Sequence, residues 1–280
     1  MSNEYKINII HRDEYGRPSG IVALNKPQDV TSHDLVNQLR KKLNTKKVGH
    51  AGALDVFADG VMIYLIGKAT KLSDKLMHLD KEYTTQIIFG IATNTQDPEG
   101  EITEVKTGYD FSDFGDLEKV LKSFIGEYEQ YVSVFSSVKV NGKKLRVIMR
   151  DENYEKHVEI DDNNRKKIIF TPKSTSTNLK PFSVSLPSKR VKIFDLELLD
   201  KGEIKVEEMG QFKQKLSTFP KNQKFPYIKI RVQSSKGTYI RQLSEDIGEK
   251  FNMPAMLLNL TRTRVGNTTL KDCIEIDEVV

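Results

Sequence analysis

The stretch KKVGHAGALDVFADGVMIYLIG, residues 46–67, places a loop of small residues between a pair of lysines and an apolar segment. The loop carries one aspartate, Asp55, with His50 five positions before it. Loops that bend around a single charged group often carry function. An aspartate in such a loop is also a common turn former, so both roles stay open on this pattern alone.

Helical patterns occur at three places around this loop. Residues 31–43 place leucines four apart, after Thr31 and Ser32, either of which can cap a helix. Residues 116–126 repeat the pattern of one apolar face. A third helix is predicted after SSKGT, with Thr238 as its cap.

Strand patterns lie between these helices. Residues 82–91 alternate between apolar and polar side chains, and residues 191–199 and 227–233 are also predicted strands. The pair Asn141-Gly142 is a strong hairpin signal. Because strands and helices interleave irregularly, the pattern favours an α+β fold over a repeating βαβ fold.

Composition limits the class of protein. The chain has 280 residues, with 44 Lys+Arg against 39 Asp+Glu, and a formal charge of +5 permits a nucleic-acid partner without demonstrating one. The single cysteine, Cys273, excludes an internal disulfide and a cysteine-rich zinc site. There is no signal-peptide pattern and no run of 18 apolar residues, so we expect a soluble protein that does not enter a membrane.

Two segments differ from the rest in composition. Residues 151–190 and 201–224 are dense in charged residues, Ser, Thr, Asn and Pro. We predict surface insertions there, built from long loops or irregular strands, within a single domain that spans residues 1–280.

Three familiar site types do not fit the opening loop. From Asp55 the third residue is Phe57 and the twelfth is Ile66, which excludes an EF-hand calcium loop. Six residues separate Gly60 from Gly67, and alanine follows the next lysine, so a phosphate loop fails as well. The zinc deaminase signature is absent. The remaining hypothesis is a site without metal, built on a carboxylate.

An ionised aspartate can act as a nucleophile or a base, and a fixed guanidinium beside it would position it. The candidate cation is Arg241, in the first turn of the third predicted helix. The residues alone leave an alternative open, because Arg241 could equally pair with Glu245 one helical turn later.

Six blocks occur in an order that resembles one known family. They are LNKPQDVTSHDLV (24–36), KKVGHAGALDVFADGVMIYLIGKATKL (46–72), DKEY (80–83), SSVKVNGKKL (136–145), SSKGTYIRQLSEDIG (234–248) and LLNLTRTRVG (257–266). Together they resemble the TruB family of tRNA pseudouridine synthases over roughly residues 20–150 and 190–267.

The resemblance implies both a fold and an activity. The fold would be a mixed, mostly antiparallel central sheet flanked by helices, with a thumb-like RNA-gripping hairpin at residues 130–155. The enzyme would convert a uridine in the T-loop of tRNA, position 55, to pseudouridine without a cofactor or a metal. We expect a monomer in the cytoplasm or an organelle. We expect no guide RNA, because the chain after residue 267 is too short for a full C-terminal PUA domain.

The resemblance also assigns residues. Asp55 matches the catalytic aspartate, Tyr83 a tyrosine that stacks on the target base, and Arg241 the arginine that pairs with the aspartate. Leu260 matches an apolar residue of the base pocket, and His50 a histidine that packs into the RNA loop.

Further matches are structural or electrostatic. Lys26 and Pro27 match a motif of the site's framework. Contacts to the RNA backbone are predicted for a set of basic residues near the motifs, namely Lys46, Lys47, Lys139, Lys143, Lys144, Arg262 and Arg264.

Two departures from the family keep other functions open. Val56 stands where most members have proline, and Asp59 where a small or hydroxyl residue is usual. The chain could therefore be a non-catalytic RNA-binding or tRNA-folding protein, although the presence of Asp55, Tyr83 and Arg241 argues against this. It could also be a pseudouridine synthase that acts on another RNA resembling a T-loop, such as an mRNA hairpin.

Overall fold

The computed structural model describes residues 6–132, 134, 139–140, 142–160, 166–173 and 179–280. The main sheet of this described part has ten strands: β1 (Ile9–Arg12), β2 (Pro18–Lys26), β3 (Val48–His50), β4 (Asp59–Ile66), β5 (Lys81–Phe89), β8 (Gly126–Tyr131), β14 (Ser188–Lys205), β15 (Lys224–Ser234), β16 (Ala255–Val265) and β17 (Thr268–Thr269). Eight strands follow the order β1–β2–β4–β16–β5–β15–β14–β8, while β3 pairs with β4 and β17 with β16.

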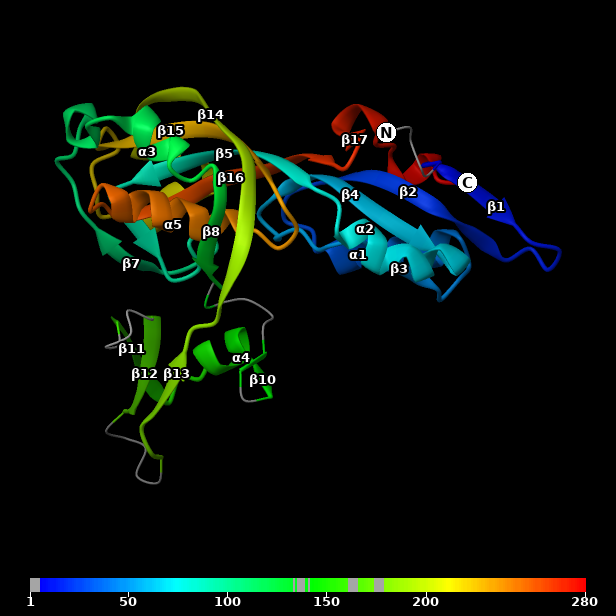
Figure 1. Ribbon diagram of the computed structural model, residues 1–280, viewed down its shortest axis with the longest axis horizontal. Coiled ribbons are helices and arrows are strands. Elements are labelled where there is room, and N and C mark those ends of the chain that lie inside the picture. The colour runs from blue at the N-terminus through cyan, green and yellow to red at the C-terminus, as the bar shows by residue number, and fades with distance from the viewer. Residues whose placement is uncertain (1–5, 133, 135–138, 141, 161–165, 174–178) are drawn as a thin grey trace.

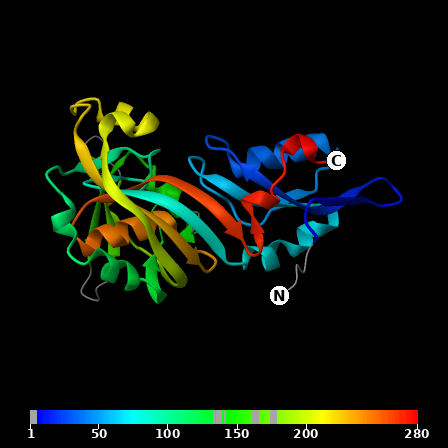
Figure 2. The same cartoon turned by 90° about the horizontal axis from the view of Figure 1, so that it is seen from above.

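The main sheet extends through two lobes of an elongated molecule (Figures 1 and 2). One lobe holds β1 to β4, and the other holds β8, β14 and β15, while β5 and β16 run between them (Figure 1). Strand β16 is parallel to β4 at Thr261 and Arg262 and antiparallel to β5. The predicted mixed, mostly antiparallel α+β fold is confirmed.

The helices cover the sheet of each lobe. The α-helices are α1 (Ser32–Lys42), α2 (Ser73–Met77), α3 (Leu117–Lys122), α4 (Leu145–Met149) and α5 (Ile240–Lys250). The 3₁₀ helices are η1 (Gly67–Leu72), η2 (Phe111–Phe114), η3 (Val206–Glu208), η4 (Gly210–Leu216), η5 (Leu270–Asp272) and η6 (Ile276–Glu278). The apolar faces of α1 and α5 both lie in the largest buried cluster, so the sheet and these two helices share one core.

The predicted cap of α1 is confirmed, whereas the predicted cap of α5 is wrong. Thr31 caps α1, and its hydroxyl accepts a hydrogen bond from the Asp34 backbone N–H at 3.0 Å. Helix α5 begins one residue later than predicted, with Tyr239 at the cap position. The Thr238 hydroxyl instead donates to Ser235 O at 3.1 Å, so it closes the preceding turn and does not cap the helix.

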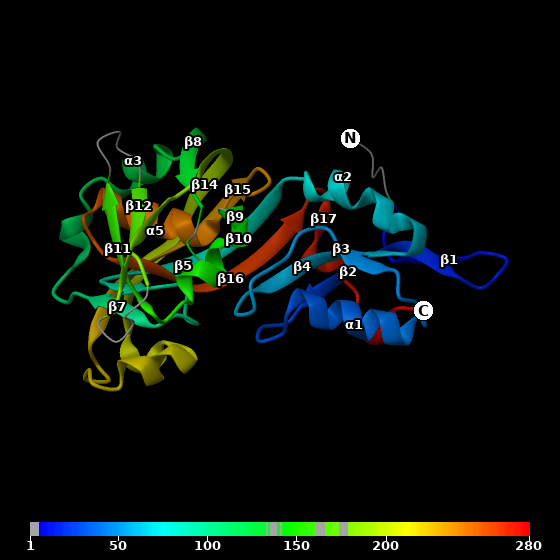
Figure 3. The same ribbon diagram turned by 90° about the horizontal axis from the view of Figure 1, so that it is seen from below.

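The segment 151–190 is more regular than predicted. It forms a three-stranded antiparallel sheet of β11 (Tyr154–Ile160), β12 (Lys166–Pro172) and β13 (Phe182–Ser185), which lies below the main sheet in Figure 1 and toward the viewer in Figure 3. Tyr154, Ile168, Phe170 and Val184 belong to a separate buried cluster. The expectation of long loops or irregular strands is therefore wrong here, because these strands bury their own apolar residues.

The segment 201–224 is also ordered. Strand β14 continues through it as far as Lys205, paired with β15, and η3 and η4 follow. Val206, Phe212 and Leu216 are buried with part of the sheet. This segment packs on the main sheet and does not loop away from it.

The predicted hairpin is flanked by two short strands, β9 (Lys139–Val140) and β10 (Lys143–Lys144). Val140 pairs with Lys143, and Gly142 has a φ of 81°, which suits a tight two-residue turn. Asn141 lies outside the described residues. The remaining small sheet pairs β6 (Ile91–Thr93) with β7 (Ile102–Val105).

One glycine is required where the two lobes join. Gly60, at the start of β4, has a φ of 117°, and a Cβ at this position would overlap the backbone oxygen of Arg262 on β16. A side chain here would therefore push β4 apart from β16, which runs between the lobes.

Gly60→Ala is expected to lower the free energy of unfolding by more than about 1 kcal/mol, because alanine meets both an unfavourable φ and a backbone clash. Gly49→Ala is the control, since no heavy atom lies within 4 Å of a Cβ built there. Urea unfolding of both variants measures the difference. Equal stabilities of the two variants would contradict this account of the lobe junction.

Candidate active site

Residues 51–58 join β3 to β4 and carry Asp55. The backbone of this loop is held from both sides by buried polar groups. The Ser32 hydroxyl accepts from Leu54 N at 3.0 Å and lies 3.1 Å from Leu54 O, to which it donates. The Arg262 guanidinium donates to Ala53 O at 3.2 Å. The two residues before Asp55 are thus fixed to α1 and to β16.

Lys26 anchors the loop on the other side of Asp55. Its side chain is fully buried, and its ammonium donates to the carbonyls of Pro27 at 2.8 Å, Val30 at 2.7 Å and Val56 at 3.2 Å. Burial lowers the pKa of Lys26. Lys26 therefore holds two chain segments together, as a framework residue of the site would.

Of the two residues that depart from the pattern of the resembled family, Val56 lies in this loop and Asp59 is the first residue of β4. Ala58 N donates to Asp55 O at 3.3 Å, which closes a turn with Val56 at its second position. Proline is favoured at that position of a type I or type II turn, so valine gives up some rigidity there. The Asp59 carboxylate accepts from the Gln28 side chain at 3.0 Å, so it is engaged outside the loop.

Asp55 and Arg241 form a two-point ion pair. The Arg241 Nε lies 3.0 Å from Asp55 Oδ2, and the Arg241 Nη2 lies 3.2 Å from Asp55 Oδ1. The arginine side chain is 11% exposed, whereas the aspartate side chain is 38% exposed. The predicted partners are therefore together, and the carboxylate is the member of the pair that a ligand can reach. The alternative pairing of Arg241 with Glu245 does not occur among the described contacts.

A second carboxylate fixes the far side of Arg241. The Arg241 Nη1 donates to Asp97 Oδ2 at 3.1 Å and to Thr95 O at 3.0 Å. The Asp97 side chain is 2% exposed, and burial raises its pKa while Arg241 opposes that shift. Sequence reasoning missed Asp97, because an aspartate beside Pro98 reads as an ordinary turn former.

The start of α5 is fixed by Gln130 on β8. The buried amide of Gln130 accepts from Tyr239 N at 2.8 Å and donates to Tyr239 O at 3.1 Å. Arg241 is the second residue of α5, so this two-way clamp sets where its side chain begins. Gln130 was also missed, because a lone glutamine in a strand carries no signal.

Tyr83 and Leu260 lie on one face of the main sheet. Tyr83 on β5 is opposite Arg262 on β16, and Leu260 is opposite Thr85, two residues further along both strands. They are therefore diagonal neighbours on the side of the sheet that α5 covers. Tyr83 is 9% exposed, so stacking of its ring on a base stays a prediction.

His50 ends β3 and is partly buried. Its Nδ1 is buried without a hydrogen-bond partner among the described residues. Burial lowers the pKa of His50, and the charges of Arg262 and His33 lower it further. The neutral ring is therefore favoured, and its packing into an RNA loop stays a prediction.

Arg262 is not a surface residue, and its predicted contact with the RNA backbone is wrong. Its side chain is 2% exposed, and its Nε donates to Val61 O at 2.7 Å. The prediction failed because it took the residue type as a sign of exposure. Arg264 is one-quarter exposed, with Nη1 bonded to Gly266 O at 2.7 Å and Nη2 at 3.8 Å from a Glu82 oxygen.

The predicted RNA-backbone lysines are exposed and fall into two groups in different parts of the chain. Lys47 O accepts from Gly67 N, so Lys46 and Lys47 lie near the far end of β4. The far end of β4 is seven strand residues from its start, which is roughly 23 Å. Lys46 and Lys47 are therefore distant from the start of β4, where the loop that carries Asp55 ends. The other three are on the β9–β10 hairpin: Lys139, Lys143 and Lys144. Their contacts with RNA stay predictions.

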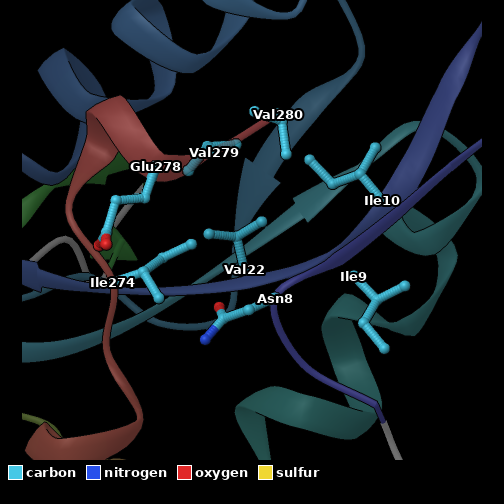
Figure 4. Close-up of a pocket in the computed structure, with 8 residues that line it drawn as sticks. All are labelled: Asn8, Ile9, Ile10, Val22, Ile274, Glu278, Val279 and Val280. Carbon is cyan, nitrogen blue, oxygen red and sulfur yellow. The ribbon is translucent and has the colours of Figure 1, made fainter.

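A pocket elsewhere involves none of these residues. It lies between the first strands and the C-terminal segment (Figure 4) and is lined by Asn8, Ile9, Ile10, Val22, Ile274, Glu278, Val279 and Val280. Within the described ranges, no group of three or more His, Cys, Asp or Glu residues is placed to hold a metal ion. No helix in the same ranges is long and apolar enough to cross a membrane.

Comparison with known sequences identifies the family. A model of the TruB family pseudouridylate synthases, N-terminal domain, matches residues 40–189. The tRNA pseudouridine synthase B of Geobacillus thermodenitrificans (strain NG80-2) is 35% identical over 260 residues, which cover 93% of this chain and 71% of that protein. The protein of the same name from Staphylococcus aureus (strain Newman) is 35% identical over 263 residues, with the same coverage. The chain belongs to the TruB family of pseudouridylate synthases, which are isomerases.

A solved structure supports the fold. The chain resembles a protein in the crystal structure of a Cbf5-Nop10-Gar1 complex, with a TM-score of 0.52 and 21% identity. The match covers 94% of this chain and 56% of that one. At this identity the likeness concerns the fold alone.

Asp97→Asn is expected to slow pseudouridine formation by about tenfold or more, because loss of the buried charge lets Arg241 shift relative to Asp55. Glu99→Gln is the matched control, since Glu99 is close by but makes no hydrogen bond to Arg241 in the described structure. Single-turnover kinetics and RNA affinity are measured for both variants. An Asp97→Asn rate equal to that of Glu99→Gln would contradict the positioning role.

Proposed function

We propose that this chain isomerises a uridine in the T-loop of tRNA, position 55, to pseudouridine, with Asp55 as the nucleophile. The observation that carries the proposal is the Asp55 carboxylate itself. It is partly exposed, gripped at two oxygens by Arg241, and set on a loop whose backbone is held before and after it. Family membership and the tRNA pseudouridine synthase B relatives support the choice of reaction and of tRNA.

The chemistry needs only groups that the chain supplies. Isomerisation breaks the bond between uracil N1 and ribose C1′ and forms a bond between uracil C5 and C1′. The C5 carbon loses a proton and N1 gains one, so the composition of the nucleoside does not change. Asp55 attacks the nucleoside so that the base can detach, turn and rejoin. No oxidant, reductant or group donor enters this balance.

The target base must leave its stack to reach Asp55, which costs a few kcal/mol. Aromatic and apolar side chains that receive the base offset this cost. Tyr83 and Leu260 are of these types and are neighbours on one sheet face. In this proposal the exposed lysines of the β9–β10 hairpin contact the RNA backbone, and such contacts do not depend on sequence.

The proposal predicts that an unmodified tRNA transcript gains pseudouridine in its T-loop with wild-type protein and none with Asp55→Asn, mapped at single-nucleotide resolution. Asp59→Asn is the control, since it removes the other carboxylate of the same segment and is expected to keep the product. If Asp55→Asn forms the product at the wild-type rate, Asp55 is not the nucleophile. If no protein forms it but all bind the tRNA equally, the non-catalytic RNA-binding function takes its place.

A further inference from the structure

The turn between β15 and α5 presents a basic tip beside the site. Ser235 N donates to Lys192 O at 2.8 Å, and Lys192 N donates to the Ser235 hydroxyl at 2.9 Å. Thr238 closes the turn through Ser235 O. The turn is therefore fixed to β14, with Lys236 and Gly237 exposed at its tip.

The side chain of Lys189 on β14 extends to this turn. Its Nζ lies 5.3 Å from the centre of the Tyr239 ring, a cation–π contact. A Cβ at Gly237 would overlap that ammonium, so the glycine provides the room it occupies. In the described part of the chain the Lys189 ammonium has no hydrogen-bond acceptor and no carboxylate within 4.0 Å. Burial and the charge of Lys236 lower its pKa.

Lys236 extends the basic surface to the other lobe. Its ammonium contacts His78 Nε2, just after α2. His78 Nδ1 lies 2.6 Å from Asp74 O, so Nδ1 carries the proton and Nε2 accepts from the lysine. The Asp74 carboxylate is 3.9 Å from His78 and makes no ion pair with Lys236 among the described contacts. Among the residues that the structure describes, neither lysine therefore has an anionic partner.

Two ammonium groups near each other repel, and an anion bound between them relieves that repulsion. The place of the two lysines in the fold indicates what kind of anion they would bind. Tyr239 lies two residues before Arg241, and burial raises its pKa, while the charge of Arg241 lowers it and that of Asp55 raises it. Lys189 thus lies on the ring of a residue that precedes Arg241 by two positions, and Lys236 lies in the turn just before it.

From this arrangement we propose that Lys189 and Lys236 form a phosphate subsite for the RNA strand next to the target nucleotide. The inference rests on the proposed function, because a uridine at Asp55 carries a phosphodiester on each side. Lysines bind phosphate as point charges, and backbone contacts fix the position of the RNA without reading its sequence. The subsite holds the sugar–phosphate of the reacting nucleotide while its base detaches and turns.

The test uses a T-arm stem–loop RNA and two copies that each carry one neutral methylphosphonate linkage, 5′ or 3′ of the target uridine. Dissociation constants are measured over a salt series for wild type, Lys189→Gln, Lys236→Gln and the control Lys192→Gln. Lys192 is on the same strand and also lies over an aromatic ring, that of Phe194 at 5.4 Å. It projects from the opposite face of β14.

Lys189→Gln and Lys236→Gln are each expected to weaken binding about tenfold and to lower the salt slope by about 1, while Lys192→Gln changes neither. One of the two neutral linkages should raise the dissociation constant of wild type. The same linkage should leave the dissociation constant of Lys189→Gln unchanged. If the effects of variant and linkage add, or if the salt slope is unchanged, the subsite does not exist. Product formation by wild type on the same RNA is scored separately, so a failure of the proposed reaction is distinguishable from a failure of the subsite.

Discussion

The Arg241 guanidinium is shared between two carboxylates, and the geometry of the site depends on that sharing. Asp97 holds it from the interior, and Asp55 meets it at two oxygens on the accessible side. A planar group with donors in a fixed fork can satisfy both partners at once, which a lysine cannot. The position of the partly exposed carboxylate therefore follows from a buried ion pair and from the Gln130 clamp at the start of α5.

The loop that carries Asp55 is held by cations that are usually found on surfaces. Lys26 and Arg262 are both buried, and their charged ends donate to backbone carbonyls of the loop and its neighbours. Burial of a charge is costly unless it is hydrogen-bonded, so these side chains stabilise only one arrangement of the chain around them. The basic residues of the family motifs thus divide into buried ones that build the site and exposed ones that remain available to RNA.

Sequence reasoning succeeded where burial is local and periodic. The helix at residues 31–43, the strand at 82–91 and the family blocks all follow from short patterns, and so does the pairing of Asp55 with Arg241 through the resemblance. Asp97 was missed because, beside Pro98, it reads as an ordinary turn former, and no short pattern connects it with Arg241, 144 residues away. The small sheet within 151–190 was missed because most residues of β11 are exposed, so its apolar pattern is weak.

The most direct test of the central claim is the single-turnover rate of pseudouridine formation by Arg241→Lys on an unmodified tRNA transcript, with tRNA affinity measured alongside. Lysine keeps the positive charge but loses the fork that grips Asp55 and Asp97 together. The account predicts a rate lower by about 10²-fold or more with affinity nearly unchanged. A rate within a few fold of wild type would show that charge alone, and not the shared guanidinium, positions Asp55.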